Sequence, residues 1–341
     1  MKKILFVLST FVLFFFSCAE YDTIYVTDDY YSICQINLDG TGYRRLIDKG
    51  YKSYSKCPSK IYFIENDNKI LIVEEEGIKE FDLNSLTSNY YNFDVIKLSA
   101  LSRDRTQLAL VKNSSIDQDI YIFNIISKNF TRVTNSPTVI KRGLSFSNDG
   151  LKIVYSTSFS SYSTIETVDI ISGTVTQLVR TDFENLTEFT FVHPIFNFED
   201  TEVFYFSIEY NPLRPKYICK LRSSNNYVID DTSSTNGGLT LSGPNDFIIY
   251  SEMEFYPWRL ISHNITQNVK HTLTENLNGG ASVSVSDDGN SVLISSFSPN
   301  EDINLVNING ANKRYLGKGY QPALSFDGST AVFIFWEAVK Q

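Results

Sequence analysis

Residues 143–150, GLSFSNDG, open the stretch of sequence that decides the fold. They are followed by residues 152–156 (KIVYS), then residues 166–173 (ETVDIISG), then residues 175–178 (VTQL). The runs are rich in Val, Ile, Thr and aromatic residues, and the breaks carry Asp-Gly and Ser-Gly, which is typical of strands joined by tight turns. Asp and Gly suit such turns because they tolerate positive φ. The stretch therefore predicts four consecutive antiparallel strands.

The same order of runs recurs along the chain, with residues 281–316 as a second clear copy. In the N-terminal copy of the repeat, we expect the apolar residues 61–63 to form the second strand, which follows the turn. The positions equivalent to the turn residue of residues 143–150 are separated by 47, 45, 50, 45, 44 and 39 residues, and they are Cys57, Asp104, Asp149, Glu199, Pro244, Asp288 and Asp327. A four-stranded antiparallel unit of about 45 residues is the size of one β-propeller blade.

Seven turn positions predict an all-β chain that forms a single seven-bladed β-propeller. The last copy ends after two strands, at residues 323–326 and 331–336. Residues 32–38 and 43–47 have the pattern of the missing third and fourth strands, so we expect N-terminal strands to close the last blade and cover its edges. Residues 23–27 also look like a strand, which keeps six or eight blades open as alternatives.

The turns and strand ends resemble the TolB-like, or WD40-like, propeller repeat. The elements that carry the resemblance are SNDG at 147–150, SDDG at 286–289, SFDG at 325–328, NLDG at 37–40 and NING at 307–310. The resemblance covers essentially all of residues 22–341. It implies the fold, but the motif is shared by proteins of very different function, so it assigns no activity.

The N-terminus has the layout of an export signal. Lys2 and Lys3 precede residues 4–16, a run of thirteen mostly apolar residues. A helix that spans a membrane needs about 20 such residues, so the run fits the hydrophobic region of a signal peptide better than a membrane span.

The end of this run resembles a lipobox, in which a small residue precedes a lipidated Cys. Cys18 follows Ser17, while Phe15 stands where Leu is usual, as in the looser signals of Bacteroidetes lipoproteins. The resemblance implies that residues 1–17 are removed as a signal peptide and that Cys18 carries lipid. Residues 18–22 then form a short tether, and residues 23–341 form the propeller. An ordinary secretory signal is the alternative.

Charge and the tether bear on location and partners. Ala19 follows Cys18 without the Asp that retains proteobacterial lipoproteins at the inner membrane, which favours an outer-membrane address in the cell envelope. Loss of the signal changes the net charge from −9 to about −11. An acidic chain of this kind argues against nucleic acid, because phosphates require a basic face.

The three cysteines beyond Cys18 are Cys34, Cys57 and Cys219. An odd number at scattered spacing indicates neither a disulfide framework nor a metal knuckle. A bridge between Cys34 and Cys57 is one interpretation, and small buried hydrophobic residues are the other.

Catalytic signals are sparse. His193 falls on the innermost strand of its blade, where it is either a channel-facing ligand or base or a hydrogen-bonded structural histidine. Propeller-type oligogalacturonate lyases also carry TolB-like repeats and hold a metal with several inward histidines, which one inner histidine does not reproduce. Gly-x-Ser-x-Gly, His-Glu-x-x-His, Walker and EF-hand patterns are absent. We therefore expect no metal, no cofactor and no catalytic residue.

Loops offer the better candidates, because a propeller scaffold presents its loops for recognition. The loops between second and third strands should gather on one face. The candidate binding residues are Phe159 and Tyr162, Tyr210 and Arg214, Tyr256 and Trp258 on these loops, with Arg142 and His193 near the channel. Aromatic and Arg side chains suit a sugar ring or a partner protein, and packing between blades is the alternative.

We expect a non-catalytic cell-envelope lipoprotein whose propeller loops bind a partner protein or a glycan. One alternative is a polysaccharide lyase or hydrolase that acts in the central channel. The other is a Tol-like envelope scaffold. The sequence does not indicate an oligomeric state.

Overall fold

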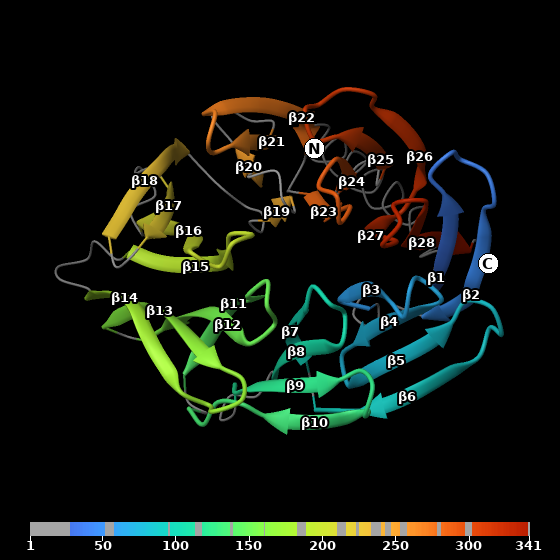
Figure 1. Cartoon of the computed structure of the whole chain (residues 1–341). Coiled ribbons are helices and arrows are strands. Elements are labelled where there is room, and N and C mark those ends of the chain that lie inside the picture. The colour runs from blue at the N-terminus through green and yellow to red at the C-terminus, as the bar shows by residue number, and fades with distance from the viewer. Residues whose placement is uncertain are drawn as a thin grey trace, which may run out of the picture.

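The computed structural model is a seven-bladed β-propeller (Figure 1). The residues it describes are 28–51, 58–94, 96–112, 118–136, 139–159, 161–182, 189–209, 216–222, 225–232, 240–242, 247–252, 258–277, 281–296 and 302–339. Their 28 strands form seven four-stranded antiparallel sheets. None of these residues belongs to a helix long and apolar enough to cross a membrane. Cys18 and residues 23–27 lie outside the described residues.

Each blade is one sheet, and its strands are named from the channel outward. Blade 1 holds β27 (Tyr320–Leu324), β28 (Thr330–Val339), β1 (Asp28–Asn37) and β2 (Arg44–Tyr51); blade 2 holds β3 (Lys60–Ile64), β4 (Lys69–Glu74), β5 (Gly77–Asp82) and β6 (Ser88–Asn92); blade 3 holds β7 (Ile96–Leu101), β8 (Gln107–Lys112), β9 (Ile120–Asn124) and β10 (Asn129–Arg132); blade 4 holds β11 (Ile140–Phe146), β12 (Lys152–Ser158), β13 (Tyr162–Asp169) and β14 (Val175–Asp182). Blade 5 holds β15 (Phe189–Phe196), β16 (Glu202–Glu209), β17 (Lys216–Arg222) and β18 (Asn225–Thr232); blade 6 holds β19 (Thr240–Ser242), β20 (Phe247–Glu252), β21 (Trp258–Asn264) and β22 (Val269–Leu277); blade 7 holds β23 (Ala281–Val285), β24 (Ser291–Ser296), β25 (Asp302–Asn307) and β26 (Arg314–Lys318).

The two ends of the chain close the ring in blade 1. Strand β1 pairs with β28 over its whole length, from Asp28 opposite Val339 to Asn37 opposite Thr330. The expected closure by N-terminal strands is confirmed, and so is the count of seven blades. Because the first and last strands share one sheet, the ring cannot open without breaking this ladder.

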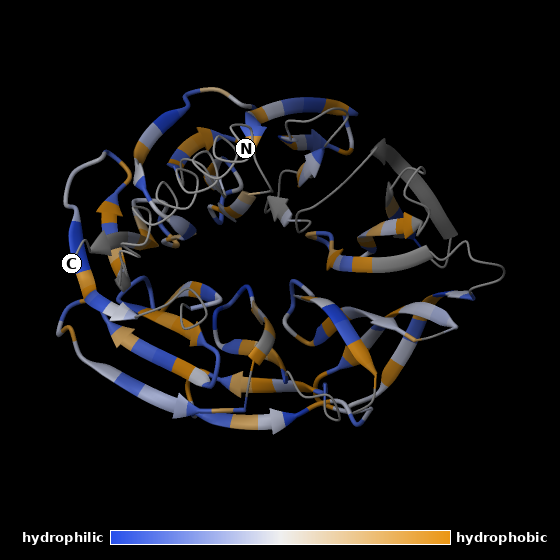
Figure 2. Cartoon of the chain, turned by 180° about the vertical axis from the view of Figure 1, so that it is seen from behind, coloured by the Kyte–Doolittle hydropathy of each residue, from blue (hydrophilic) through white to orange (hydrophobic). Residues whose placement is uncertain are grey.

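The hydrophobic core is divided into seven clusters, one at each junction between neighbouring blades. Alternation along a strand explains this, since successive side chains point to opposite faces. In β4, Ile70 and Ile72 pack toward blade 1, while Leu71 and Val73 pack toward blade 3. Middle strands are thus apolar on both faces, which Figure 2 shows as orange segments inside the blades.

A Ser-x-Asp motif builds the turn between the first and second strands of a blade, here called its inner turn. In blade 4 the Ser147 hydroxyl donates to Asp149 at 2.6 Å and accepts the N–H of Lys152 at 2.9 Å. Asp149 also accepts the N–H of Leu151 at 2.9 Å, and these hydrogen bonds hold the pKa of Asp149 below its ordinary value. The same bonds recur at Ser102-x-Asp104, Ser286-x-Asp288 and Ser325-x-Asp327.

Blade 2 corrects one expectation. Residues 61–63 lie in β3, the first strand of the blade, and not in its second strand. Its inner turn is formed by Glu65, Asn66 and Asp67, all with left-handed backbone at φ of 50°, 52° and 65°. Cys57, expected to mark this turn, lies outside the described residues. Asn and Asp tolerate this conformation, so the turn forms without glycine.

Cys34 and Cys219 are buried free thiols. Burial raises the pKa of the Cys34 thiol and raises that of Cys219 to about 11. Cys34 and Cys219 are therefore small buried side chains, which agrees with the interpretation of the cysteines as buried hydrophobic residues.

Candidate functional site

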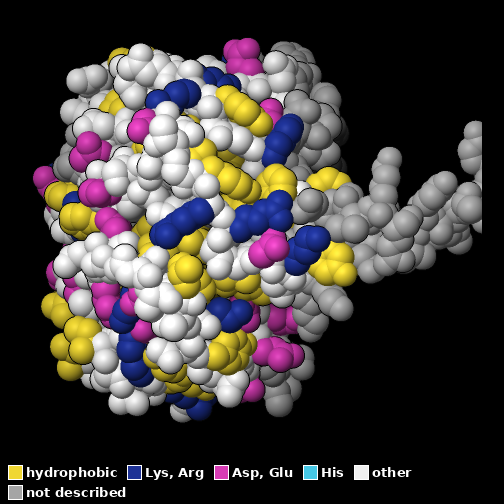
Figure 3. All heavy atoms as spheres, turned by 90° about the vertical axis from the view of Figure 1, so that its right-hand side faces the viewer, with side chains coloured by type: hydrophobic (Ala, Val, Ile, Leu, Met, Phe, Trp, Pro, Cys, Tyr) yellow, Lys and Arg dark blue, Asp and Glu magenta, His cyan; other side chains and the backbone are white. Residues whose placement is uncertain are grey.

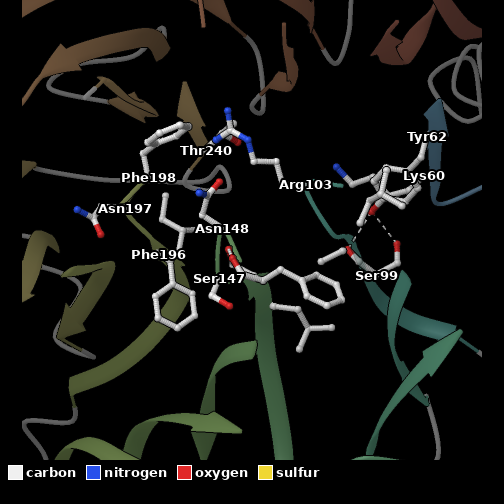
Figure 4. Close-up of a pocket in the computed structure, with 16 residues that line it drawn as sticks. Lys60, Tyr62, Ser99, Arg103, Ser147, Asn148, Phe196, Asn197, Phe198 and Thr240 are labelled. Carbon is white, nitrogen blue, oxygen red and sulfur yellow. Dashed lines mark hydrogen bonds between the residues drawn. The ribbon is translucent and has the colours of Figure 1, made fainter. Parts of the chain in front are cut away.

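A pocket of about 410 Å³ opens at one end of the central channel (Figure 4). Its walls come from the first strands of blades 2 to 6 and from the inner turns of blades 3, 4 and 5. The side chains that give it chemical character are Lys60, Tyr62, Arg103, Asn148, Phe198 and Thr240. The volume lies in the range of small-molecule sites, which use a few convergent polar groups on a partly apolar wall.

The inner turns explain how three of these side chains reach the pocket. Arg103, Asn148 and Phe198 each occupy the second position of an inner turn, directly after the residue that bonds to its backbone. The Arg103 guanidinium lies 4.0 Å from the centre of the Phe198 ring, a cation–π contact between blades 3 and 5. From β3, Tyr62 donates to the carbonyl of Ser99 at 3.0 Å.

Carboxylates from one inner turn cap the backbone of the preceding one. Asp200 of blade 5 accepts the N–H groups of Asn148 and Asp149 at 2.6 and 3.1 Å. Asp67 of blade 2 does the same for Phe326 and Asp327 of blade 1, at 2.6 and 3.1 Å. We call these two arrangements turn latches. They hold neighbouring inner turns in fixed relation, and the latch of Asp200 holds one wall of the pocket.

Arg105 joins inner turns that are far apart in sequence. Its guanidinium contacts Asp67 at 3.1 Å and Asp287 of blade 7 at 2.9 Å, and it lies 4.8 Å from the centre of the Phe326 ring. Blades 1, 2, 3 and 7 are thereby connected beside the pocket. Arg105 thus contacts Phe326 and Asp287, which occupy the second positions of the inner turns in blades 1 and 7.

His193 lies on β15, the innermost strand of blade 5, and its side chain is solvent-exposed. Its backbone is left-handed, at φ 52°, within an irregularity of the β15–β16 pairing between Val192 and Ile195. Desolvation, followed by the charges of Lys60 and Arg142, lowers the pKa of His193. The neutral imidazole is therefore favoured, and the two predicted channel residues His193 and Arg142 lie close enough to interact.

Channel and exterior differ in charge pattern. On the side of the ring that Figure 3 shows, basic and acidic side chains are interspersed. The described residues that line the pocket include Lys60 and Arg103 but no carboxylate. An acidic chain thus places a basic surface inside its channel.

The predicted aromatic rim is partly built, on the face opposite the pocket. The Phe159 and Tyr162 rings are stacked 4.1 Å apart, and the Arg180 guanidinium lies 3.9 Å from the centre of the Tyr162 ring. Two groups this close to one ring centre must lie on its two faces. Both faces of Tyr162 are therefore covered, and its edge and the outer face of Phe159 remain for a ligand.

Trp258 does not belong to an exposed rim. It is 6% exposed and packs in the core cluster between blades 6 and 7, which is the packing alternative considered from the sequence. Tyr210, Arg214 and Tyr256 lie outside the described residues.

No group of three or more His, Cys, Asp or Glu side chains that could hold a metal occurs among the described residues. The pocket residues at the second turn positions, Arg103 and Phe198 above all, were missed from the sequence. The signal was present, because a motif that uses its first and third residues for the turn leaves the second free to face outward.

No protein-family model matches the chain, and no curated protein matches its sequence. Among solved structures, TolB from Acinetobacter baumannii superposes with a TM-score of 0.58 and 15% identity, over 76% of this chain and 67% of that one. Oligogalacturonate lyase from Vibrio parahaemolyticus superposes with a TM-score of 0.62 and 12% identity, over 90% and 97%. An oligogalacturonate lyase in complex with manganese gives 0.62 and 12%, over 89% and 90%. At these identities the likeness establishes the fold, a propeller shared with TolB-like proteins and with these lyases.

Proposed function

We propose that this chain is a cell-envelope lipoprotein, anchored by lipid on Cys18, that binds a partner protein or a glycan without transforming it. The observation that carries the proposal is the pocket, in which turns and strands from five blades bring Arg103, Phe198, Asn148 and Lys60 together. Aromatic, amide and cationic groups on a rigid frame are what recognition requires. Few of these groups are suited to acid–base chemistry.

The Phe159 and Tyr162 stack gives the proposal a second contact surface on the opposite face. The half-buried Phe159 ring suits a sugar or an apolar side chain of a partner. Because the pocket and this stack lie at opposite ends of the blades, variants of each separate the two surfaces.

Retention by the immobilised chain tests the proposal. We expect the purified chain to retain one or more glycans from a glycan array, or one or more proteins from a detergent extract of the source envelope. Phe198→Ala should reduce retention at least tenfold if the pocket is used, and Phe159→Ala if the opposite face is used. Tyr315→Ala is the matched control, because Tyr315 is an exposed aromatic on β26 of blade 7. Unchanged retention in both test variants would refute recognition through these surfaces.

The anchor has its own test. Metabolic labelling with a fatty acid should mark the chain, and Cys18→Ser should abolish the label and release the protein from the membrane fraction. A Cys18→Ser chain that still fractionates with membranes would contradict anchoring by this residue.

A lyase that acts in the channel is the second candidate function. It is favoured by the fold shared with oligogalacturonate lyases and by His193, which lies on an innermost strand and has a lowered pKa that favours the neutral imidazole. Incubation with oligogalacturonate, with and without manganese, followed by chromatography of the products tests it directly. Shortened chains that disappear with His193→Gln would replace the binding proposal by this one.

A further inference from the structure

We propose that the channel contains an anion-binding site, formed by Lys60 and Arg103 in the pocket and by His193 and Arg142 along the adjoining wall, for a small ligand that bears carboxylate or phosphate groups. The proposal rests on the proposed binding function and names the chemical class of its ligand. Four features of the structure support it.

The first feature is convergence. Lys60 comes from blade 2, Arg103 from blade 3, Arg142 from blade 4 and His193 from blade 5. Lys60 and Arg103 both line the pocket, and Figure 4 shows both side chains extending into it. Lys60 and Arg142 both act on His193 through their charges. Donor groups from four blades therefore surround one section of the channel.

The second feature is the lack of carboxylate partners. Within the described part of the chain, no ion pair or side-chain hydrogen bond involves any of these four side chains. Cations elsewhere in the same structure are paired, as Arg105 is with two carboxylates and Lys79 is with Glu74 at 2.7 Å. Desolvation also lowers the pKa of Lys60. All four side chains are solvent-exposed, so their charged or polar ends are accessible to an anionic ligand.

The third feature is the strained backbone at His193. Its left-handed φ of 52° lies where most non-glycine residues are disfavoured, and the neighbouring Gly143 takes φ 71° on β11. A Cβ added to Gly143 would lie 2.8 Å from the His193 Cα, so the two strands are in close contact there. Strained non-glycine residues of this kind are found most often at binding and active sites. The His193 imidazole lies near enough to Lys60 and Arg142 for their charges to act on it.

The fourth feature is the electrostatic field in the pocket. A cleft lined by one sign of charge with low-dielectric walls concentrates counter-ions. The described lining of the pocket carries cations without a carboxylate, although the whole chain has 39 acidic residues against 30 basic ones. A neutral glycan would gain nothing from this arrangement, whereas an acidic sugar, an organic acid or a phosphorylated compound would.

Calorimetry and thermal unfolding of the full chain in detergent test the proposal with citrate and inorganic phosphate as probes. We expect at least one probe to bind and to raise the melting temperature, with potassium chloride at the same ionic strength giving no rise. Binding of citrate alone, or of phosphate alone, identifies which acidic group the site accepts. No binding and no stabilisation by either probe at millimolar concentration would overturn the proposal.

Variants locate the site. Lys60→Met and Arg142→Met should each weaken binding about tenfold or more, because each removes a charge-assisted hydrogen bond to the anion. Lys313→Met should leave it unchanged, since Lys313 is an exposed lysine before β26. Melting temperatures without probe establish that each variant is folded. Equal affinities across all three variants would place binding outside the channel and overturn the assignment.

This inference and the proposed function fail separately. If the chain retains a glycan or a partner but binds neither citrate nor phosphate, only the anion site is refuted. Absence of retention with probe binding intact removes the proposed function alone.

Discussion

A buried ion pair at the junction of blades 3 and 4 gives the most direct test of how the channel wall is held. Asp119 and Lys141 are both 0% exposed, with 3.6 Å between the Asp119 carboxylate and the Lys141 ammonium. Asp119 also accepts the Thr134 hydroxyl and the Ser136 N–H, each at 2.7 Å, and contacts Arg132. Lys141 immediately precedes Arg142 on β11, so this network positions the strand that carries one of the channel cations.

The replacement Asp119→Asn should lower the free energy of unfolding by about 3–5 kcal/mol, the usual cost of leaving a buried charge without its partner. The side chain keeps its shape, but the Lys141 ammonium stays buried beside a neutral amide. A domain of this kind is stable by about 5–15 kcal/mol, so the loss is a large share of the total. Arg132 is 42% exposed and can be solvated, so Lys141 accounts for most of the cost.

Urea denaturation followed by circular dichroism measures this loss, and a double-mutant cycle assigns it. Asp119→Asn with Lys141→Met should recover at least about 1 kcal/mol relative to Asp119→Asn alone, because no buried charge remains unpaired. A loss below about 1 kcal/mol for Asp119→Asn, or a double variant no more stable than the single one, would refute the reasoning. Burial acts to raise the pKa of Asp119, but its hydrogen bonds and the nearby cations lower it overall. This part of the stability is therefore present above about pH 4 and lost as the pH falls through the lowered value.

Two further predictions concern the channel wall. Asp200→Gly should lower the free energy of unfolding by about 1–2 kcal/mol in urea titrations. The variant loses the latch hydrogen bonds, while glycine relieves the left-handed φ of 57° at this position. Leu86→Gly is the control, because Leu86 is exposed and also has φ 57°, and it should not destabilise the chain. The lowered pKa of His193 means that its contribution is complete above about pH 6.5 and is lost as the pH falls, since protonation then meets Lys60 and Arg142. Between pH 7.5 and 5.5 the native chain should therefore lose more stability than His193→Gln, and equal losses would contradict this reasoning.

The sequence predicted the fold because its main signals are local. Asp-Gly turns and alternating strands mark each blade, and the missing half blade indicated the closure that β1 and β28 form. Blade 2 was misaligned at Cys57 because its turn, at residues 65–68, replaces Asp-Gly by residues that reach left-handed φ without glycine. A search for a fixed spacing passes over such a turn, although Asn66 and Asp67 are themselves turn residues.

The site was harder to predict because it depends on contacts between blades. No periodic rule says that Arg105 of blade 3 meets Asp287 of blade 7, or that Arg103 stacks on Phe198. Trp258 shows the converse problem. Its loop position suggested exposure, but the side chain at the start of a strand turns into the junction between blades. The repeat did place His193 on the innermost strand of its blade, where β15 lies.

Departures from the repeat are the best guide to where this propeller acts. The described inner turns of blades 1, 4 and 7 keep Ser-x-Asp-Gly, whereas those of blades 2, 3 and 5 read ENDN, SRDR and NFED. The turns of blades 3 and 5 line the pocket through Arg103 and Phe198, and blade 2 lines it through Lys60 and Tyr62 of β3; the regular turn of blade 4 also contributes Asn148. Sequences that specify one structure tend to break their local rules at functional sites, where a side chain is needed that the fold alone would not select. Arg105 and Asp200 stand where the regular turns have glycine, and each uses its side chain to connect inner turns of different blades. The irregular turns therefore accept backbone strain in return for side chains that fix and line the channel mouth, which is the arrangement expected if the pocket, rather than the outer rim, is the principal binding surface.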